Sequence, residues 1–303
     1  MKIRRIRTTT GLQTQASATD GQWRPLNGEL PFGPSPFSDD WQLATADRHL
    51  AQTDSLLPFA PLSFRDYLLS EKHNINASRG IVKRFYPRSY RMTRAVELVT
   101  RRPFPGFKPN KLFYAEPIYY FGNAMTVVPT GTPIAFPSYS KGLDFELELG
   151  WVLKAPLYNA TPSEAVEAIG AFVLLNDFSA RDVQRAEMAS GLGPQKAKHF
   201  ISSLSATAVT ADELLPRLDR LTGSVIINGR TVSTVSSRGL QWSVGEALAH
   251  SSRDERLMPG EMFGTGTLPG GSGTETGHWL KAGDTLRLVL DGVGEVEHRI
   301  VAS

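Results

Sequence analysis

Residues 143–150 carry the pattern that most constrains the fold. In this stretch Asp144, Glu146 and Glu148 alternate with apolar residues. Successive side chains of a strand point to opposite faces, so the pattern predicts a strand with one acidic face and one packed face. Same-face residues lie about 6.6 Å apart along a strand, which lets two carboxylates converge on one cation. A solvated sheet face is the alternative explanation.

Short strand patterns separated by turns fill most of the chain. Residues 171–175 form a continuous apolar run, which is typical of a strand buried on both faces, and Asn228-Gly229 between two alternating runs predicts a β-hairpin. Helices are expected at residues 63–73, 89–100, from 161, 180–188 and 243–251, with Thr161, Ser179 and Ser243 as N-caps. Many strands with isolated helices indicate an α+β fold that is mostly β.

The chain is expected to divide into two domains. Residues 1–57 are interpreted as a small β-rich N-terminal domain, with strands at 2–8, 22–25 and 41–44. Residues 58–303 form the larger second domain, which holds every candidate functional residue named below.

The charge balance excludes partners that are bound mainly by electrostatic attraction. The chain has 33 basic and 30 acidic residues among 303, so we expect a small-molecule partner, no nucleic acid and no membrane surface. No apolar run approaches the roughly 18 residues of a membrane span. The absence of Cys fits a reducing compartment, and we expect a cytoplasmic protein.

Several familiar catalytic motifs are absent. The sequence has no P-loop and no G-x-S-x-G elbow, and its six His residues show no H-x-x-x-H spacing. Nucleotide binding, serine-hydrolase chemistry and zinc chemistry are therefore not expected.

Four segments in fixed order resemble the fumarylacetoacetate hydrolase family. They are Asp66-Tyr-Leu-Leu-Ser-Glu-Lys-His73, Tyr120-Phe-Gly122, Asp144-Phe-Glu146-Leu-Glu148, and Asn176-Asp177-Phe-Ser-Ala-Arg181-Asp182-Val-Gln184 followed by Lys198-His-Phe200. The resemblance implies a β-roll catalytic domain over residues 58–303, a homodimer, a divalent metal, and a 1,3-dicarbonyl or 2-oxo-acid substrate.

The same resemblance implies site residues. The family's metal ligands match Asp66, Glu146, Glu148 and Asp177, an all-oxygen set suited to Mg²⁺ or Ca²⁺, with Mn²⁺ as a further alternative. The general base matches His73, and the donors that face a developing oxyanion match Arg181, Gln184 and Lys198. Substrate contacts match Tyr120 and Thr265.

Two departures from the family pattern bear on the substrate. Leu68 and Met188 stand where members that cleave fumarylacetoacetate place Tyr to hold the substrate's carboxylates. Apolar side chains leave a buried carboxylate unsatisfied, so we expect an apolar or aromatic substrate group beside them.

These observations predict a metal-dependent hydrolase that cleaves a carbon–carbon bond in an acylpyruvate or other 1,3-diketone, with water activated by His73. Two alternatives stay open. One is a metal-dependent decarboxylase, hydratase or tautomerase of a 2-oxo acid, which needs only enolate stabilisation and proton transfer. The other is a catalytically silent binding protein with the same fold.

Overall fold

The computed structural model describes residues 1–18, 20–26, 30–33 and 55–302. Its strands are β1 (Lys2–Thr8), β2 (Gly11–Ser17), β3 (Trp23–Pro25), β4 (Phe64–Tyr67), β5 (Tyr119–Gly122), β6 (Val127–Pro129), β7 (Ile134–Ala135), β8 (Leu143–Asp144), β9 (Leu147–Leu153), β10 (Ile169–Asp177), β11 (Ser179–Ala180), β12 (Ser202–Leu204), β13 (Thr207–Thr210), β14 (Thr222–Ile227), β15 (Arg230–Ser236), β16 (Met262–Gly264), β17 (Thr285–Leu290) and β18 (Gly294–Val301).

Most of the α-helices are short, and the two longest follow one another in the chain with a single residue between them. They are α2 (Glu71–Phe85), α3 (Pro87–Thr100), α4 (Lys111–Ala115), α5 (Pro162–Glu167), α6 (Arg181–Ser190), α7 (Ala211–Leu214), α8 (Val244–Ser251) and α9 (Gly273–Thr276). Segments of 3-10 helix lie at Pro105–Phe107, Ala124–Thr126 and Leu215–Arg220. The expected α+β fold with a predominance of strands is confirmed.

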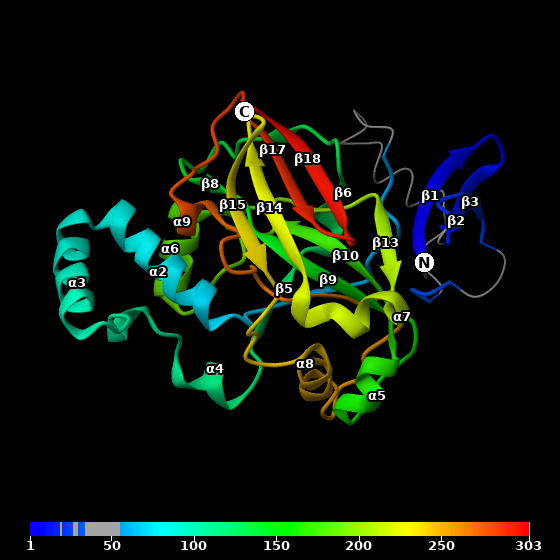
Figure 1. Cartoon of the computed structure of the whole chain (residues 1–303), viewed down its shortest axis with the longest axis horizontal. Coiled ribbons are helices and arrows are strands. Elements are labelled where there is room, and N and C mark those ends of the chain that lie inside the picture. The colour runs from blue at the N-terminus through cyan, green and yellow to red at the C-terminus, as the bar shows by residue number, and fades with distance from the viewer. Residues whose placement is uncertain (19, 27–29, 34–54, 303) are drawn as a thin grey trace.

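Two main sheets organise the molecule. The larger has the strand order β3-β2-β1-β13-β10-β9-β16-β4-β5, and a smaller one has the order β15-β14-β17-β18-β7. Figure 1 shows β1–β3 at one end of the long axis and α3 at the other. The strands that carry the acidic side chains, β4, β9 and β10, therefore lie close together inside the large sheet.

The strand β10 is buried on both faces, as its apolar run predicts. Phe172 and Leu174 belong to one core cluster, which also contains Leu286 and Leu288 of the smaller sheet. Val173 points to the opposite side and belongs to a second cluster. Strand β10 is thus fixed from both faces, and it holds Asp177 at its end rigidly.

Local signals were reliable where turn and cap chemistry decides the structure. The hairpin between β14 and β15 turns at Asn228 and Gly229, with φ of 52° and 75°, and both predicted capping boxes are present, at Thr161 and Ser243. These three predictions are confirmed.

Two local predictions are wrong. Residues 64–67 form the strand β4 and not the start of a helix, because they pair with the parallel strand β16 and all four side chains are buried. The helix α2 begins only at Glu71, with Ser70 as its N-cap. Ser179 does not cap α6, since its hydroxyl donates to the carbonyl of Asp177 and its backbone pairs with Asp144.

The amino-terminal strands join the large sheet at its edge. Strand β1 pairs antiparallel with β2 and with β13, where Lys2 faces Val209. The strand expected at residues 41–44 lies outside the described residues, and the domain boundary at residue 57 stays a prediction. In the described part of the chain, no helix combines the length and the apolar character that a bilayer crossing requires.

Candidate metal and acid–base site

Three buried carboxylates converge from three strands of the large sheet. Asp66 comes from β4, Glu148 from β9 and Asp177 from β10, and one oxygen of each lies within 4.8 Å of the others. Gly264 of β16 lies between them, and a Cβ atom there would come within 2.5 Å of Asp66 Oδ1 and 2.9 Å of Glu148 Oε2. Because Gly264 has no side chain, the space between these carboxylates stays open.

This cluster has the chemistry of a divalent-metal site. Both carboxylate oxygens of Glu148 are buried and have no hydrogen-bond partner among the described residues. Burial, with the nearby Asp66, raises the pKa of Glu148 well above its ordinary value, and burial with Asp177 raises the pKa of Asp66 to about 7. A bound divalent cation would satisfy these oxygens, and an all-oxygen donor set fits Mg²⁺, Ca²⁺ or Mn²⁺.

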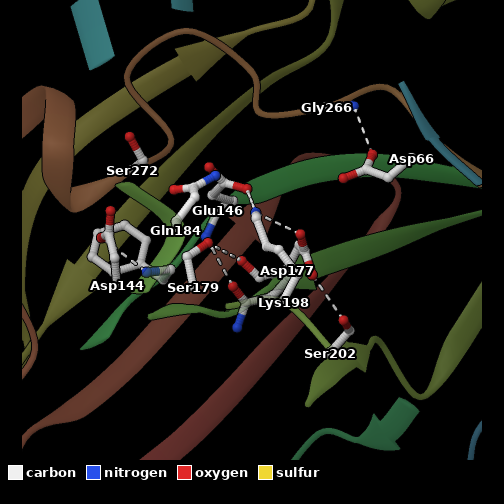
Figure 2. A network of polar contacts seen from close by, with 12 residues as sticks. Asp66, Asp144, Glu146, Asp177, Ser179, Gln184, Lys198, Ser202, Gly266 and Ser272 are labelled. Atoms are coloured by element: carbon white, nitrogen blue, oxygen red, sulfur yellow. Dashed lines mark hydrogen bonds and ion pairs between the residues drawn. The ribbon is translucent and has the colours of Figure 1, made fainter. Parts of the chain in front are cut away.

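Glu146, also predicted as a metal ligand, lies beside the cluster in a different environment. One of its oxygens accepts from Arg181 Nη2 at 2.7 Å, and the other accepts from the ammonium of Lys198. Figure 2 shows Lys198 between Glu146 and Asp177, whose Oδ2 lies 2.6 Å from Nζ. Burial alone would raise the pKa of Glu146, but the two cations hold it well below its ordinary value. Its place in the ligand set stays a prediction.

Arg181 is the centre of a buried ion-pair network. Its Nε donates to Asp144 Oδ2 at 2.7 Å, and its Nη1 donates to Gln184 Oε1 at 2.9 Å. Asp144 also accepts from the backbone N–H groups of Gly273 and Thr274, at 2.7 and 3.1 Å. Asp144 therefore joins α6 to α9. Sequence reasoning did not assign it this role, although the residue was visible as the first acid of the alternating stretch.

His73, the predicted general base, lies in the first turn of α2 and contacts an acid. Its Nδ1 lies 2.6 Å from Glu275 Oε1, and both side chains are buried. The helix α9, which carries Glu275, packs tightly on α2: a Cβ on Gly80 would lie 1.7 Å from the carbonyl oxygen of Thr274. The sequence left the acid partner of His73 open, because the region around Glu275, which lies 202 positions away, matches the family pattern only loosely.

One cavity of about 480 Å³ collects most of the predicted site residues. Its lining includes Asp66, Leu68, His73, Tyr120, Glu146, Glu148, Arg181, Gln184, Met188 and Lys198. The hydroxyl of Tyr120 donates to Asp177 Oδ2 at 2.5 Å, which places this phenol at the edge of the carboxylate cluster.

Two residues around the cavity differ from the expected set. Thr265 is fully buried and its hydroxyl donates to the carbonyl of Gly266, while Thr267 lines the cavity. Arg185 also lines it and had not been singled out, although it lies one helical turn beyond Arg181 on α6.

Comparison with known proteins identifies the fold and the family. A sequence model described as fumarylacetoacetate (FAA) hydrolase C-terminal matches residues 93–301. The oxaloacetate tautomerase FAHD1, mitochondrial, of Homo sapiens is 27% identical over 169 residues, which cover 56% of this chain and 76% of the relative.

Solved structures cover the chain more completely. The fumarylacetoacetate hydrolase of Exiguobacterium antarcticum superposes with a TM-score of 0.69 at 17% identity and covers 100% of both chains. A 5-carboxymethyl-2-hydroxymuconate delta-isomerase from Mycobacterium smegmatis superposes with a TM-score of 0.68 at 20% identity, again over 100% of both chains. At these identities the two structures support the fold.

Proposed function

The chain belongs to the fumarylacetoacetate hydrolase family, and on that premise we propose that it hydrolyses a carbon–carbon bond in an acylpyruvate or a related 1,3-diketone. The observation that carries the proposal is a single cavity that His73 and the carboxylates of Asp66 and Glu148 all line. A base and an ion-binding cluster on one cavity are the two parts that hydrolysis of a dicarbonyl requires.

The carboxylates of Asp66, Glu148 and Asp177 would hold the divalent metal. When bound, the ion supplies Lewis-acid polarisation of the two carbonyl oxygens of the substrate.

His73 acts on the attacking water. Its Nδ1 is engaged by Glu275, which leaves Nε2 to accept the proton, and the adjacent carboxylate stabilises the imidazolium that forms. The water oxygen bonds to the acyl carbonyl carbon. The bond from that carbon to the pyruvate methylene then breaks, its electron pair stays on the methylene carbon, and this carbon takes up the proton. The products are a carboxylic acid and pyruvate.

Gln184 and Lys198 face the negative charge that develops on the substrate. Because Gln184 Oε1 accepts from Arg181, the amide nitrogen of Gln184 is the end left to donate to a group in the cavity. Lys198 is held by Glu146 and Asp177 and contributes a fixed positive charge at the same wall. Fixed donors of this kind stabilise a transition state without reorganising.

A panel of acylpyruvates tests the proposal. The purified protein with Mg²⁺ should consume the ultraviolet absorbance of the diketone and release pyruvate and one carboxylic acid in equal amounts, as followed by NMR. Loss of absorbance without two acids would contradict hydrolysis.

A tautomerase is the second candidate, because FAHD1, which is 27% identical to this chain over 169 residues, carries the name of an oxaloacetate tautomerase. That reaction needs only stabilisation of an enolate and proton transfer, and no water attacks the substrate. Interconversion of oxaloacetate tautomers without cleavage of any acylpyruvate would favour it, and release of carbon dioxide would favour a decarboxylase. A protein inactive on all these substrates would point to the catalytically silent alternative. The homodimer and the cytoplasmic location stay predictions.

A further inference from the structure

A second hollow adjoins the cavity just described. It is an open groove of about 610 Å³ between α2 and α3. Most of its wall is apolar and is formed by Ile81, Val82, Met92, Val96, Phe104 and Phe107. The helix α3 projects at the end of the molecule opposite β1–β3 (Figure 1), and Met92 on it is 73% exposed.

The groove and the cavity adjoin along α2 and share part of their lining. Ser78 and Ile81 line both. Arg185 lines the cavity and Tyr86 lines the groove. Arg185 Nη1 donates to the hydroxyl of Tyr86 at 2.5 Å. Ile81 lies eight residues beyond His73 on the same helix, which at 1.5 Å per residue is about 12 Å.

An ion pair ties the two helices of the groove together, and its acid, Glu97, is buried. Arg79 of α2 donates to Glu97 of α3 at 2.7 Å, and Glu97 also accepts from the backbone N–H of Phe104 at 3.1 Å. Both carboxylate oxygens of Glu97 are engaged by Arg79. The apolar walls are thus preformed, and the acid beneath them is already neutralised.

We propose that this groove binds the extended apolar tail of the substrate, whose dicarbonyl head lies in the cavity beside His73. The identity of the head group rests on the proposed function. The substrate class is then a long-chain acylpyruvate or a 2-oxo acid with an unbranched hydrocarbon tail. Such a tail covers apolar side chains of α3 that otherwise face water, and each newly buried methylene strengthens binding by up to about fourfold.

Chain-length series test the proposal by binding and by turnover separately. Calorimetry with the Mg²⁺-loaded protein would use 2-oxobutanoate, 2-oxooctanoate and 2-oxododecanoate, which keep the 2-oxo-acid end of an acylpyruvate but lack the second carbonyl and the bond to be cleaved. Turnover would use acetylpyruvate, hexanoylpyruvate and decanoylpyruvate. We expect the dissociation constant of the longest 2-oxo acid to be lower than that of the shortest by about tenfold or more. This is less than the full burial of all the added methylenes would give.

Two matched variants on α3 locate the effect. Val96→Asp places a charge in the groove wall and should remove the gain from chain length while it leaves the short substrates unchanged. Val99→Asp is the control, since Val99 is 85% exposed on the same helix and does not line the groove. It should behave as the wild type.

The outcomes separate the tail from the reaction. If long 2-oxo acids bind more tightly and Val96→Asp abolishes this, while no acylpyruvate is cleaved, the groove assignment holds and the proposed reaction is wrong. If acylpyruvates are cleaved with no dependence on chain length, the reaction holds and the groove assignment is overturned. The groove assignment is also overturned if Val96→Asp and Val99→Asp lose the gain from chain length equally. It is overturned as well if a second copy of the chain covers the groove, so that tails of all lengths bind alike.

Discussion

Glu146 and Glu148 lie two residues apart, are both buried, and occupy opposite environments. The carboxylate of Glu146 is bound by the cations of Arg181 and Lys198, whereas neither oxygen of Glu148 has a partner among the described residues. Their pKa values accordingly move in opposite directions from the ordinary value: the two cations lower that of Glu146 against the effect of burial, and burial raises that of Glu148.

The difference shows that alternation along a strand does not decide what an acid does. Glu146 meets a guanidinium from α6 and an ammonium from the segment before β12. Glu148 faces the carboxylates of Asp66 and Asp177 and the space left by Gly264. In one half of the site the carboxylate is neutralised by cations of the chain, and in the other half the clustered carboxylates have the chemistry of a divalent-metal site.

The largest effect on stability is expected from breaking the neutralised half. Glu146→Gln leaves Arg181 and Lys198 buried with one anionic partner fewer and should cost about 3 kcal/mol of unfolding free energy, because uncompensated buried charge is expensive. The isosteric Glu148→Gln should cost nothing or stabilise the protein when a chelator is present, since it removes an unpaired buried carboxylate. Urea denaturation in a chelator measures both, and equal losses would contradict the comparison.

The next largest effect is expected on turnover, from a change at His73 that leaves the environments of Glu146 and Glu148 unchanged. His73→Ala removes the base and should lower turnover by at least ~10²-fold, while metal binding is retained. Asn74→Ala is the control, because Asn74 also lines the cavity but has no assigned role. Full activity in His73→Ala together with an inactive Glu146→Ala would move the decarboxylase or tautomerase alternative ahead.

His298 offers a third kind of buried polar group, satisfied by neutral partners alone. Its Nδ1 lies 2.8 Å from the carbonyl of Thr132 and its Nε2 lies 2.8 Å from Ser203 Oγ. Burial lowers the pKa of His298 to about 4. Because an unfolded His has a pKa near about 6.5, the stabilisation is complete above that pH and is lost as the pH falls toward 4.

We therefore expect His298 to account for a loss of about 2 kcal/mol in unfolding free energy between about pH 7 and pH 5. Denaturation curves of the wild type and of His298→Gln at both pH values measure how much of the loss in unfolding free energy is due to His298. An identical pH dependence in the two proteins would contradict the assignment.

The smallest effect is expected at the apolar end of the cavity. Met188→Gln should lower kcat/KM for an alkyl acylpyruvate by about fourfold, the contribution of roughly one buried methylene. The wild type should also prefer alkyl acylpyruvates to the dicarboxylate fumarylacetoacetate. Steady-state kinetics on the two substrates would contradict this if the dicarboxylate were turned over as well or better.

Features set by neighbours in the sequence could be predicted from it. The turn at Asn228 and Gly229, the capping boxes at Thr161 and Ser243, and the burial of β10 all follow from local chemistry. Strand β4 could not be found in this way, because its pairing with β16 joins residues about 200 positions apart and overrides a helical pattern of apolar residues.

The site shows the same limit. The acids were visible because their types and spacing are chemically distinctive. What each acid contacts was not visible, since Glu275 reaches His73 across 202 positions and Arg181 reaches Glu146 across 35. Only the folded chain separates a paired carboxylate from an unpaired one.

The most direct test of the account is calorimetric titration of chelator-treated protein with Mg²⁺ and with Mn²⁺. We predict that the wild type binds a single ion per chain and that Glu148→Gln binds none. Glu275→Gln, a change at a buried acid outside the carboxylate cluster, should bind as the wild type does. Unchanged binding by Glu148→Gln, or no binding by the wild type, would contradict the assignment of Asp66, Glu148 and Asp177 as a metal site.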